Sequence, residues 1–301
     1  MPPSRRALLA SLLAPALGSC TAPLPALTSP ATTPAAQALL AESAAAHGVG
    51  ALAGISDLNI SYAGEWPSFV NRLQPELVDA GFRGGSQERL LLRERMVAQA
   101  HAGPSGRKQV VRRTPPGTPG DVRVWDNGVE TRDKNRRDAA ALVVDAYSVF
   151  LLGPMVLAQH WAAERSLVME LAGVERVRLD GRDYECDVLR ARITPGLGLS
   201  DADDLALYVD RPERLMRRVR ITLNGLGGTR GALAEVDASD HVMLHGVRWP
   251  TRFVERLLRP LPLHVHDWRL TGLDVNRGLT VAEVSGVAFS GRASTAATAL
   301  S

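Results

Sequence analysis

The residues with the clearest capacity for chemistry are two histidines near the C-terminal end. His264 and His266 occupy alternate positions of an apolar-alternating stretch, so both imidazoles lie on one face of a predicted strand. This spacing suits a metal ion when a third ligand converges, but Asp267 lies on the opposite face. His241 and His245 flank a predicted turn. We interpret all four as surface or pocket-rim histidines, and we expect no metal and no cofactor.

Other catalytic signatures do not match. Gly84-Gly85-Ser86 and Gly103-Pro104-Ser105-Gly106 differ from the Gly-x-Ser-x-Gly nucleophile motif, and neither lies at a strand-to-helix elbow. The glycine-rich run 225–231 lacks the final glycine spacing of a dinucleotide loop. The acidic residues in 201–204 are too close together for an EF-hand loop and indicate a polar turn. We expect no catalytic residue, and an uncharacterised hydrolase remains the second alternative.

The N-terminal residues have the pattern of an export signal. Arg5 and Arg6 precede an apolar stretch that is too short to span a bilayer. The run Leu17-Gly18-Ser19-Cys20 resembles the lipobox of bacterial lipoproteins, in which the cysteine is acylated and becomes the new N-terminus. We predict a signal peptide at residues 1–19 and lipid attachment at Cys20, which holds the protein to a membrane. A plain cleaved signal with an incidental cysteine is the alternative, and the arginine pair fits either twin-arginine or general export.

The charge balance excludes one class of partner. Cleavage before Cys20 removes two arginines and no acid, so the formal net charge falls from +3 to +1. Nothing in that balance favours nucleic acid. Acylation of Cys20 leaves Cys186 as the second cysteine, so we expect no intramolecular disulfide.

The segments at both ends of the mature chain have little to bury. Residues 20–34 are rich in Pro, Ala, Thr and Ser, so we expect a flexible, lipid-anchored tether. Ala35 to Ala46 is alanine-rich and ends before Gly48, which predicts a helix. Residues 290–301 form an Ala, Ser and Thr tail that we expect to be disordered.

Strands and two helices follow in order. Alternating polarity predicts a strand over Asp57–Tyr62 and two strands within Gln87–Arg113, and Asp126-Asn127-Gly128 is a hairpin signal. Helical spacing then replaces the alternation from Asp138 to Phe150. After a break at Gly153-Pro154, a second short helix is predicted over residues 156–161.

The alternation returns at Leu167 and continues to Leu273. Asp180-Gly181 predicts one hairpin turn, and His245-Gly246 separates a strand pattern over 238–244 from another over 247–257. Amphipathic strands joined by short turns favour one antiparallel sheet that is strongly curved, because such a sheet buries one face and exposes the other.

The order of these pieces resembles the LolA/LolB-like lipoprotein-carrier fold over about residues 35 to 275. The matching pieces are the N-terminal helix, the two turns, the helices inserted mid-sheet and the long meander, with Gly103-Pro104-Ser105-Gly106, Trp125-Asp126-Asn127-Gly128, Asp180-Gly181-Arg182-Asp183-Tyr184, Leu207-Tyr208-Val209-Asp210 and His245-Gly246-Val247-Arg248-Trp249-Pro250. The resemblance implies an α+β, mainly antiparallel β fold: an unclosed curved β-barrel (half-barrel) with helices plugging the concave face. We assign this domain to residues 35–289. The predicted lipid anchor and the length of the sheet after the helices depart from the minimal soluble carriers.

A curved sheet with an apolar inner face predicts a pocket for acyl chains. The alternation pattern places one set of candidate ligand-binding residues on the sheet: Leu58, Ile60, Leu205, Leu207, Val219, Ile221, Trp268 and Leu270. The helical pattern adds the lid residues Leu142, Val143, Ala146, Tyr147 and Phe150. A dry core made by the same residues is the alternative.

The sequence therefore predicts a cell-envelope lipoprotein that binds an apolar ligand, a lipid or an acyl chain, in trafficking of lipids or lipoproteins. A structural or interaction lipoprotein that docks an envelope protein partner without a small ligand is the first alternative. Thr21 after the lipidated cysteine is uncharged. In bacteria with Lol sorting, such a residue favours the outer membrane, at the periplasmic face of the envelope.

Overall fold

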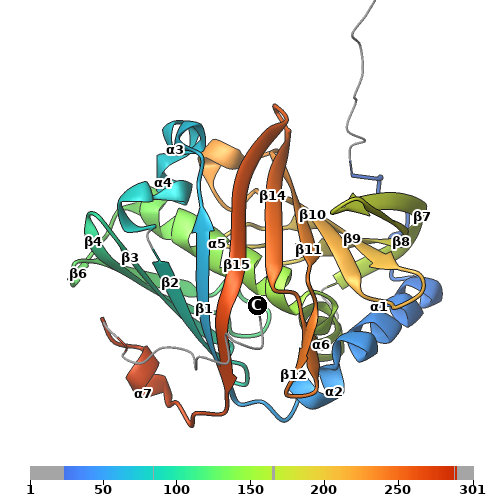
Figure 1. Cartoon of the computed structure of the whole chain (residues 1–301), viewed down its shortest axis with the longest axis horizontal. Helices are drawn as coiled ribbons and strands as arrows, with labels where there is room; N and C mark the ends of the chain where they lie inside the picture. The colour runs from blue at the N-terminus through green and yellow to red at the C-terminus, as the bar shows by residue number, and fades with distance from the viewer. Residues whose placement is uncertain (1–23, 84, 165–166, 288, 290–301) are drawn as a thin grey trace, which may run out of the picture.

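The computed structural model describes residues 24–83, 85–164, 167–287 and 289. These residues form one 13-stranded sheet in the order β6-β5-β4-β3-β2-β1-β15-β14-β11-β10-β9-β8-β7, in which neighbouring strands are antiparallel. Figure 1 shows the sheet curving around the interior without closing. The predicted α+β half-barrel, mainly antiparallel and unclosed, is confirmed.

The strands of the main sheet are β1 (Asp57–Glu65), β2 (Gly85–Leu91), β3 (Met96–Gly103), β4 (Gly106–Arg113), β5 (Asp121–Asp126), β6 (Val129–Glu130), β7 (Leu167–Leu179), β8 (Arg182–Ile193), β9 (Asp203–Asp210), β10 (Met216–Thr222), β11 (Leu233–Ser239), β14 (Arg252–Arg259) and β15 (Leu263–Val275). A separate small hairpin joins β12 (Val242–Leu244) to β13 (Val247–Trp249). The helical elements are α1 (Pro34–His47), α2 (Val49–Leu52), α3 (Ser68–Leu73), α4 (Pro75–Val78), η1 (Ala80–Phe82), α5 (Lys134–Leu152), α6 (Pro154–Glu164), η2 (Gly227–Thr229) and α7 (Val281–Val284).

Helix α5 lies across the concave face of the sheet. It begins after Asp133, whose side chain accepts a hydrogen bond from the backbone N–H of Arg136, and it ends at Gly153, which has a positive φ of 47°. Pro154 then begins α6, as a proline at a first helical position can. The two helices and the break between them agree with the sequence prediction. None of the helices in the described residues is both long and apolar enough to cross a bilayer.

Two details of the sheet differ from the sequence prediction. Two strands were predicted within Gln87–Arg113, but this range contains most of three. A turn at residues 92–95 separates β2 from β3, and Arg95 in this turn has a positive φ of 50°. His245-Gly246 does form a turn, but it joins β12 to β13 in the small hairpin. The main-sheet strands on either side are β11 and β14, which pair directly with each other.

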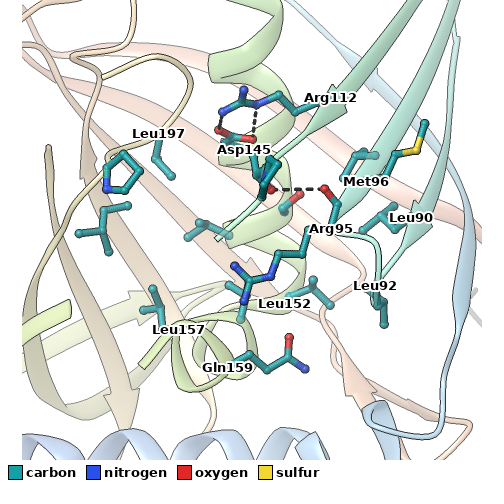
Figure 2. A pocket seen from close by; sticks show the side chains of 18 of the residues that line it. Leu90, Leu92, Arg95, Met96, Arg112, Asp145, Leu152, Leu157, Gln159 and Leu197 are labelled. Atoms are coloured by element: carbon teal, nitrogen blue, oxygen red, sulfur yellow. Dashed lines mark hydrogen bonds and ion pairs between the residues drawn. The ribbon is translucent and has the colours of Figure 1, made fainter. Parts of the chain in front are cut away.

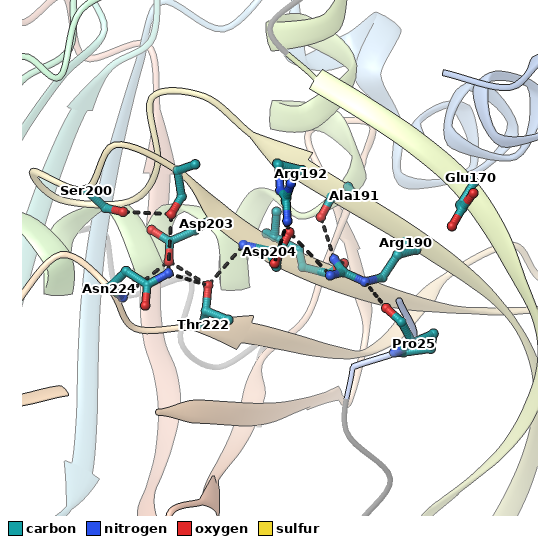
Figure 3. Close-up of polar contacts among 12 residues, drawn as sticks. Pro25, Glu170, Arg190, Ala191, Arg192, Ser200, Asp203, Asp204, Thr222 and Asn224 are labelled. Atoms are coloured by element: carbon teal, nitrogen blue, oxygen red, sulfur yellow. Dashed lines mark hydrogen bonds and ion pairs between the residues drawn. The ribbon is translucent and has the colours of Figure 1, made fainter. Parts of the chain in front are cut away.

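The expected tether lies against the sheet wherever the structure describes it. The Glu170 carboxylate accepts hydrogen bonds from the backbone N–H groups of Thr28 and Ser29, at 2.6 and 2.8 Å. The Arg190 Nε donates to the Pro25 carbonyl at 2.6 Å (Figure 3). Thr33 continues the contact by donating its N–H to the carbonyl of Met169 at 2.9 Å. Residues 24–33 are therefore docked on β7 and β8, whereas a flexible tether was predicted over 20–34. Cys20 lies outside the described residues.

The opposite, convex face of β2 to β5 is covered by the C-terminal segment. Val284 and Phe289 pack with Met96 and Trp125 there. The buried Asp57 carboxylate holds the start of this segment, since it accepts hydrogen bonds from the N–H groups of Arg277, Gly278 and Leu279 at 3.0 to 3.3 Å. Residues 290–301, expected to be a disordered tail, lie outside the described residues.

Replacing Asp57 by Asn tests how this carboxylate fixes the C-terminal segment. The amide keeps the shape but turns an NH2 toward backbone donors, so we expect the free energy of unfolding to fall by about 2 kcal/mol. Urea denaturation measures the change, with Asp183→Asn at an exposed position near the start of β8 as the matched control. Equal stability of the two variants would contradict this role of Asp57.

Candidate ligand-binding cavity

The structure brings the predicted pocket residues together, but they pack against one another and do not line an open pocket. The set Leu58, Ile60, Leu142, Ala146, Tyr147, Phe150, Leu205, Leu207, Val219, Ile221, Trp268 and Leu270 belongs to one buried cluster between the sheet and α5, and Val143 is half-buried against it. Interdigitated side chains leave little space in such a layer. Their role toward a ligand stays a prediction, and their observed role is to fill the middle of the concave face.

A cavity of about 180 Å³ lies elsewhere, in the gap between the two ends of the sheet. Strands β2 to β4 contribute one wall, β7 and β8 with the loop after β8 contribute the other, and α5 and α6 lie between them. Figure 2 shows the side chains converging from these elements. Its apolar wall includes Leu90, Met96, Leu152, Leu157, Leu167 and Leu197. None of the thirteen sequence-predicted residues lines this cavity.

A buried ion pair ties the two walls together. Arg112 of β4 donates to both Asp145 oxygens of α5, with Nε–Oδ1 and Nη2–Oδ2 distances of 3.1 and 2.8 Å. The same Nη2 donates to the Gly198 carbonyl at 2.7 Å, and the Gly198 N–H donates back to Asp145 at 2.8 Å (Figure 2). A two-pronged pair of this kind fixes orientation as well as distance. It therefore sets how far the β4 wall stands from the loop after β8.

The acidic turn near residue 200 supports the same loop. The buried Asp203 carboxylate accepts hydrogen bonds from the Leu197 N–H at 2.9 Å and from the Thr222 hydroxyl at 2.6 Å. Its partners gather around it in Figure 3. Burial raises the pKa of Asp203 above its ordinary value. The residues predicted as a polar turn thus position Leu197, which lines the cavity.

A second cavity of about 30 Å³ lies at the other end of the strands, where β2 begins. Trp66 stacks on His266 with ring centroids 3.8 Å apart, and the Arg83 guanidinium lies 5.3 Å from the centroid of Trp66. The Tyr147 hydroxyl is hydrogen-bonded to His266 Nδ1 at 3.1 Å. Burial lowers the pKa of His266 to about 2, which keeps its imidazole neutral. This cavity has room for little more than water.

The histidine pair does not act as a unit. His266 is buried beside Tyr147, whereas His264 is exposed. His241 contacts the ring of His47, with centroids 5.9 Å apart. Within the part of the chain that the structure describes, no group of three or more His, Cys, Asp or Glu side chains is arranged to hold a metal ion.

A buried carboxyl group lies near the smaller cavity. Glu88 of β2 accepts a hydrogen bond from the Gln99 amide at 2.5 Å and is 2% exposed. Burial raises its pKa from 4.5 to about 7, against the opposing effects of Gln99 and of Arg83. The alternation within Gln87–Arg113 places Glu88 and Gln99 on strands, but the sequence offers no sign that both face the interior.

Several solved structures are similar to this chain. A DUF1329 family protein from Desulfovibrio piger aligns with a TM-score of 0.48 and 13% identity, over 84% of this chain and 97% of that one. A LolA superfamily protein from Nitrosomonas europaea gives a TM-score of 0.46 and 11% identity, over 83% and 96%. A domain described as an outer membrane lipoprotein-sorting protein, from Vibrio parahaemolyticus, gives 0.44 and 9%, over 82% and 95%.

A LolA superfamily protein, as the sequence resemblance implied, is thus among the structures similar to this chain. No protein-family model matches the sequence, and no curated protein sequence matches it significantly. The three TM-scores lie below 0.5.

Removing one partner of the buried ion pair tests its contribution. In the Asp145→Ala variant the Arg112 side chain, which is 2% exposed, loses its counter-ion. We therefore expect the free energy of unfolding to fall by about 4 kcal/mol. The exposed Arg211–Glu185 pair supplies the control, where Glu185→Ala should change stability by less than about 1 kcal/mol. Comparable losses in the two variants would show that the pair does not hold the walls.

The raised pKa of Glu88 predicts a pH dependence. Since the folded state keeps this proton more strongly than the unfolded state, it binds more protons between about pH 4.5 and 7, and its stability falls as the pH rises through that window. The Glu88→Gln variant lacks this effect, so its stability relative to the wild type should improve by about 3 kcal/mol from pH 4.5 to 7.5. Urea denaturation across this range measures the difference. The exposed Glu94→Gln variant should show no such trend, and a flat difference for Glu88→Gln would overturn the prediction.

Proposed function

We propose that this chain is an envelope lipoprotein that holds an apolar ligand, a lipid or an acyl chain, in the 180 Å³ cavity. One observation carries the proposal. The cavity lies where the sheet fails to close, and leucines from both walls and from the two helices face it, including Leu90, Leu152, Leu157 and Leu197. Each methylene group transferred from water into such a space contributes about 0.8 kcal/mol, so an acyl chain gains affinity with every carbon that enters.

The cavity has an open end through which a chain can enter. Pro115, Thr118 and Pro119 on the β4–β5 loop are exposed, as is Gln159 of α6, and all four line the cavity. The deep end lies at the buried Arg112–Asp145 pair. A ligand therefore meets the loop first and apolar side chains next.

The cellular setting is part of the same proposal. We infer that residues 1–19 are removed, that Cys20 carries the lipid, and that the domain of residues 35–289 stands at the periplasmic face of the outer membrane. Residues 24–33 dock on β7 and β8. If Cys20 is lipidated, few residues separate the anchor from the folded domain.

Mass spectrometry of what co-purifies with the chain tests the proposal most directly. The Cys20→Ser variant removes the acyl anchor, so any lipid extracted after native purification comes from a binding site. We expect lipids or fatty acids in the extract. A lipid-free protein that also fails to bind a fluorescent fatty acid would refute the proposal and favour a scaffold that docks a protein partner.

Filling the cavity should weaken ligand binding without unfolding the protein. Val156 of α6 is half-buried and lines the cavity, so Val156→Phe places a ring in the space. We expect affinity for a fluorescent fatty acid to fall about tenfold or more, because several methylenes lose their place. The control Val174→Phe adds the same ring at a position of β7 that is 48% exposed. Equal affinities for both variants would place the ligand elsewhere.

A further inference from the structure

The cavity ends where the packed core begins. Its inner wall carries Val149 and Leu152 of α5, which are 5% and 3% exposed, and both side chains also belong to the cluster that fills the concave face. Under β15, in the middle of the sheet, the rings of Phe150 and Trp268 lie with their centroids 5.9 Å apart. A chain that enters from the mouth therefore meets packed side chains at this wall.

The buried ion pair closes the deep end. The Arg112 and Asp145 side chains are 2% and 15% exposed, and they bind each other and the Gly198 backbone (Figure 2). The pair cannot move aside without breaking these charge-assisted hydrogen bonds. An alkyl chain gains affinity where it meets apolar side chains, whereas this end presents charged ones. The apolar part of the cavity thus has a limited length.

The volume sets how many carbons the cavity can hold. An apolar cavity of about 150 Å³ holds a benzene molecule, which is roughly 25 Å³ for each carbon atom. At that ratio the 180 Å³ between the walls holds about seven carbons. Two chains of that length would need about twice the space, and close-packed protein walls have low compressibility. The cavity therefore has room for one chain.

We propose that the ligand enters as a single alkyl chain with about seven buried carbons, so that the site selects single-chain amphiphiles of medium length. This proposal rests on the proposed function and adds the number and length of the chains. The polar end of such a ligand lies at the mouth, where Thr118 and Gln159 are exposed. Further carbons of a longer chain stay there too, and a two-chain lipid leaves its second chain outside.

Neutral ligands that share one head group measure the length limit. n-Alkyl maltosides from pentyl to decyl are titrated, below their micelle concentrations, into the chain of residues 20–301 with Cys20→Ser, and binding is followed by NMR of the isotope-labelled protein. We expect the affinity to rise about fourfold for each methylene up to about seven carbons, since each buried methylene contributes about 0.8 kcal/mol. From octyl to decyl the rise for each methylene should be below about 1.5-fold, because these carbons stay in water.

A pair of zwitterionic lipids measures the number of chains. Hexanoyl lysophosphatidylcholine has one six-carbon chain and dihexanoylphosphatidylcholine has two, and either chain alone is short enough for the cavity. We expect the second chain to strengthen binding by no more than about twofold, because either of two equivalent chains can enter. Entry of both chains would bury several more methylenes and raise the affinity more than about a hundredfold.

Two substitutions in the walls move the chain length at which the rise in affinity stops. Val149→Ala shortens a side chain of the inner wall, so this length should increase by about two carbons. Val156→Phe fills space from α6, so it should decrease by about three carbons. Val174→Ala and Val174→Phe make the same changes at an exposed position of β7 and should keep the wild-type length. Thermal unfolding of each variant checks that the fold is intact.

The outcomes separate the two proposals. A steady rise in affinity up to decyl maltoside, or a gain beyond about twofold from the second chain, would overturn the single medium-length chain and leave an apolar-ligand site standing. A limiting length that stays the same in Val149→Ala and Val156→Phe would overturn it too, since the walls of this cavity would not set the limit. Failure of all the maltosides and both lipids to bind would refute the proposed function, and with it the single-chain proposal.

Discussion

Burial of one face of a very wide sheet is the requirement on which the rest of this structure depends. The concave face presents Leu58, Ile60 and their neighbours on adjacent strands, and α5 and α6, together with α1 and α2, cover them. Helix α5 has small side chains where it approaches the sheet most closely, since Ala140, Ala141 and Val144 pack on Val110 and Val124. With this helix inside, the sheet wraps a core and leaves its two ends apart.

The gap between those ends gives the cavity. Packing is dense under the middle of the sheet, where both the strands and α5 contribute side chains. It is looser between β2–β4 and β7–β8, where the cavity lies. At this border Arg112 reaches across to Asp145 and the Gly198 carbonyl. A buried ion pair adds little net stability compared with apolar packing, but it fixes geometry well. Here it keeps a defined space open where apolar side chains alone would tend to collapse.

Local chemistry made much of the fold predictable. Asp126-Asn127-Gly128 and Asp180-Gly181 form the turns expected of them, because Asn127, Gly128 and Asp180 adopt positive φ angles that such residues tolerate. The helical spacing of apolar residues before Gly153 likewise predicted α5. The cavity was not predictable in this way. Arg95 and Leu197 are more than a hundred positions apart, and their approach depends on how far the whole sheet curves. Periodicity identified the apolar face, but it could not say where side chains fill that face and where they leave space.

The docking of residues 24–33 has a consequence for solubility. Strand β7 ends the sheet, and an unpaired terminal strand invites strand addition from another molecule. The N–H of Thr33 and the hydroxyl of Thr32 bind the backbone carbonyls of Met169 and Leu167, so the first residues of β7 are already occupied. Residues 24–33 thus occupy backbone groups of β7 that would otherwise be open to pairing with a strand of another molecule.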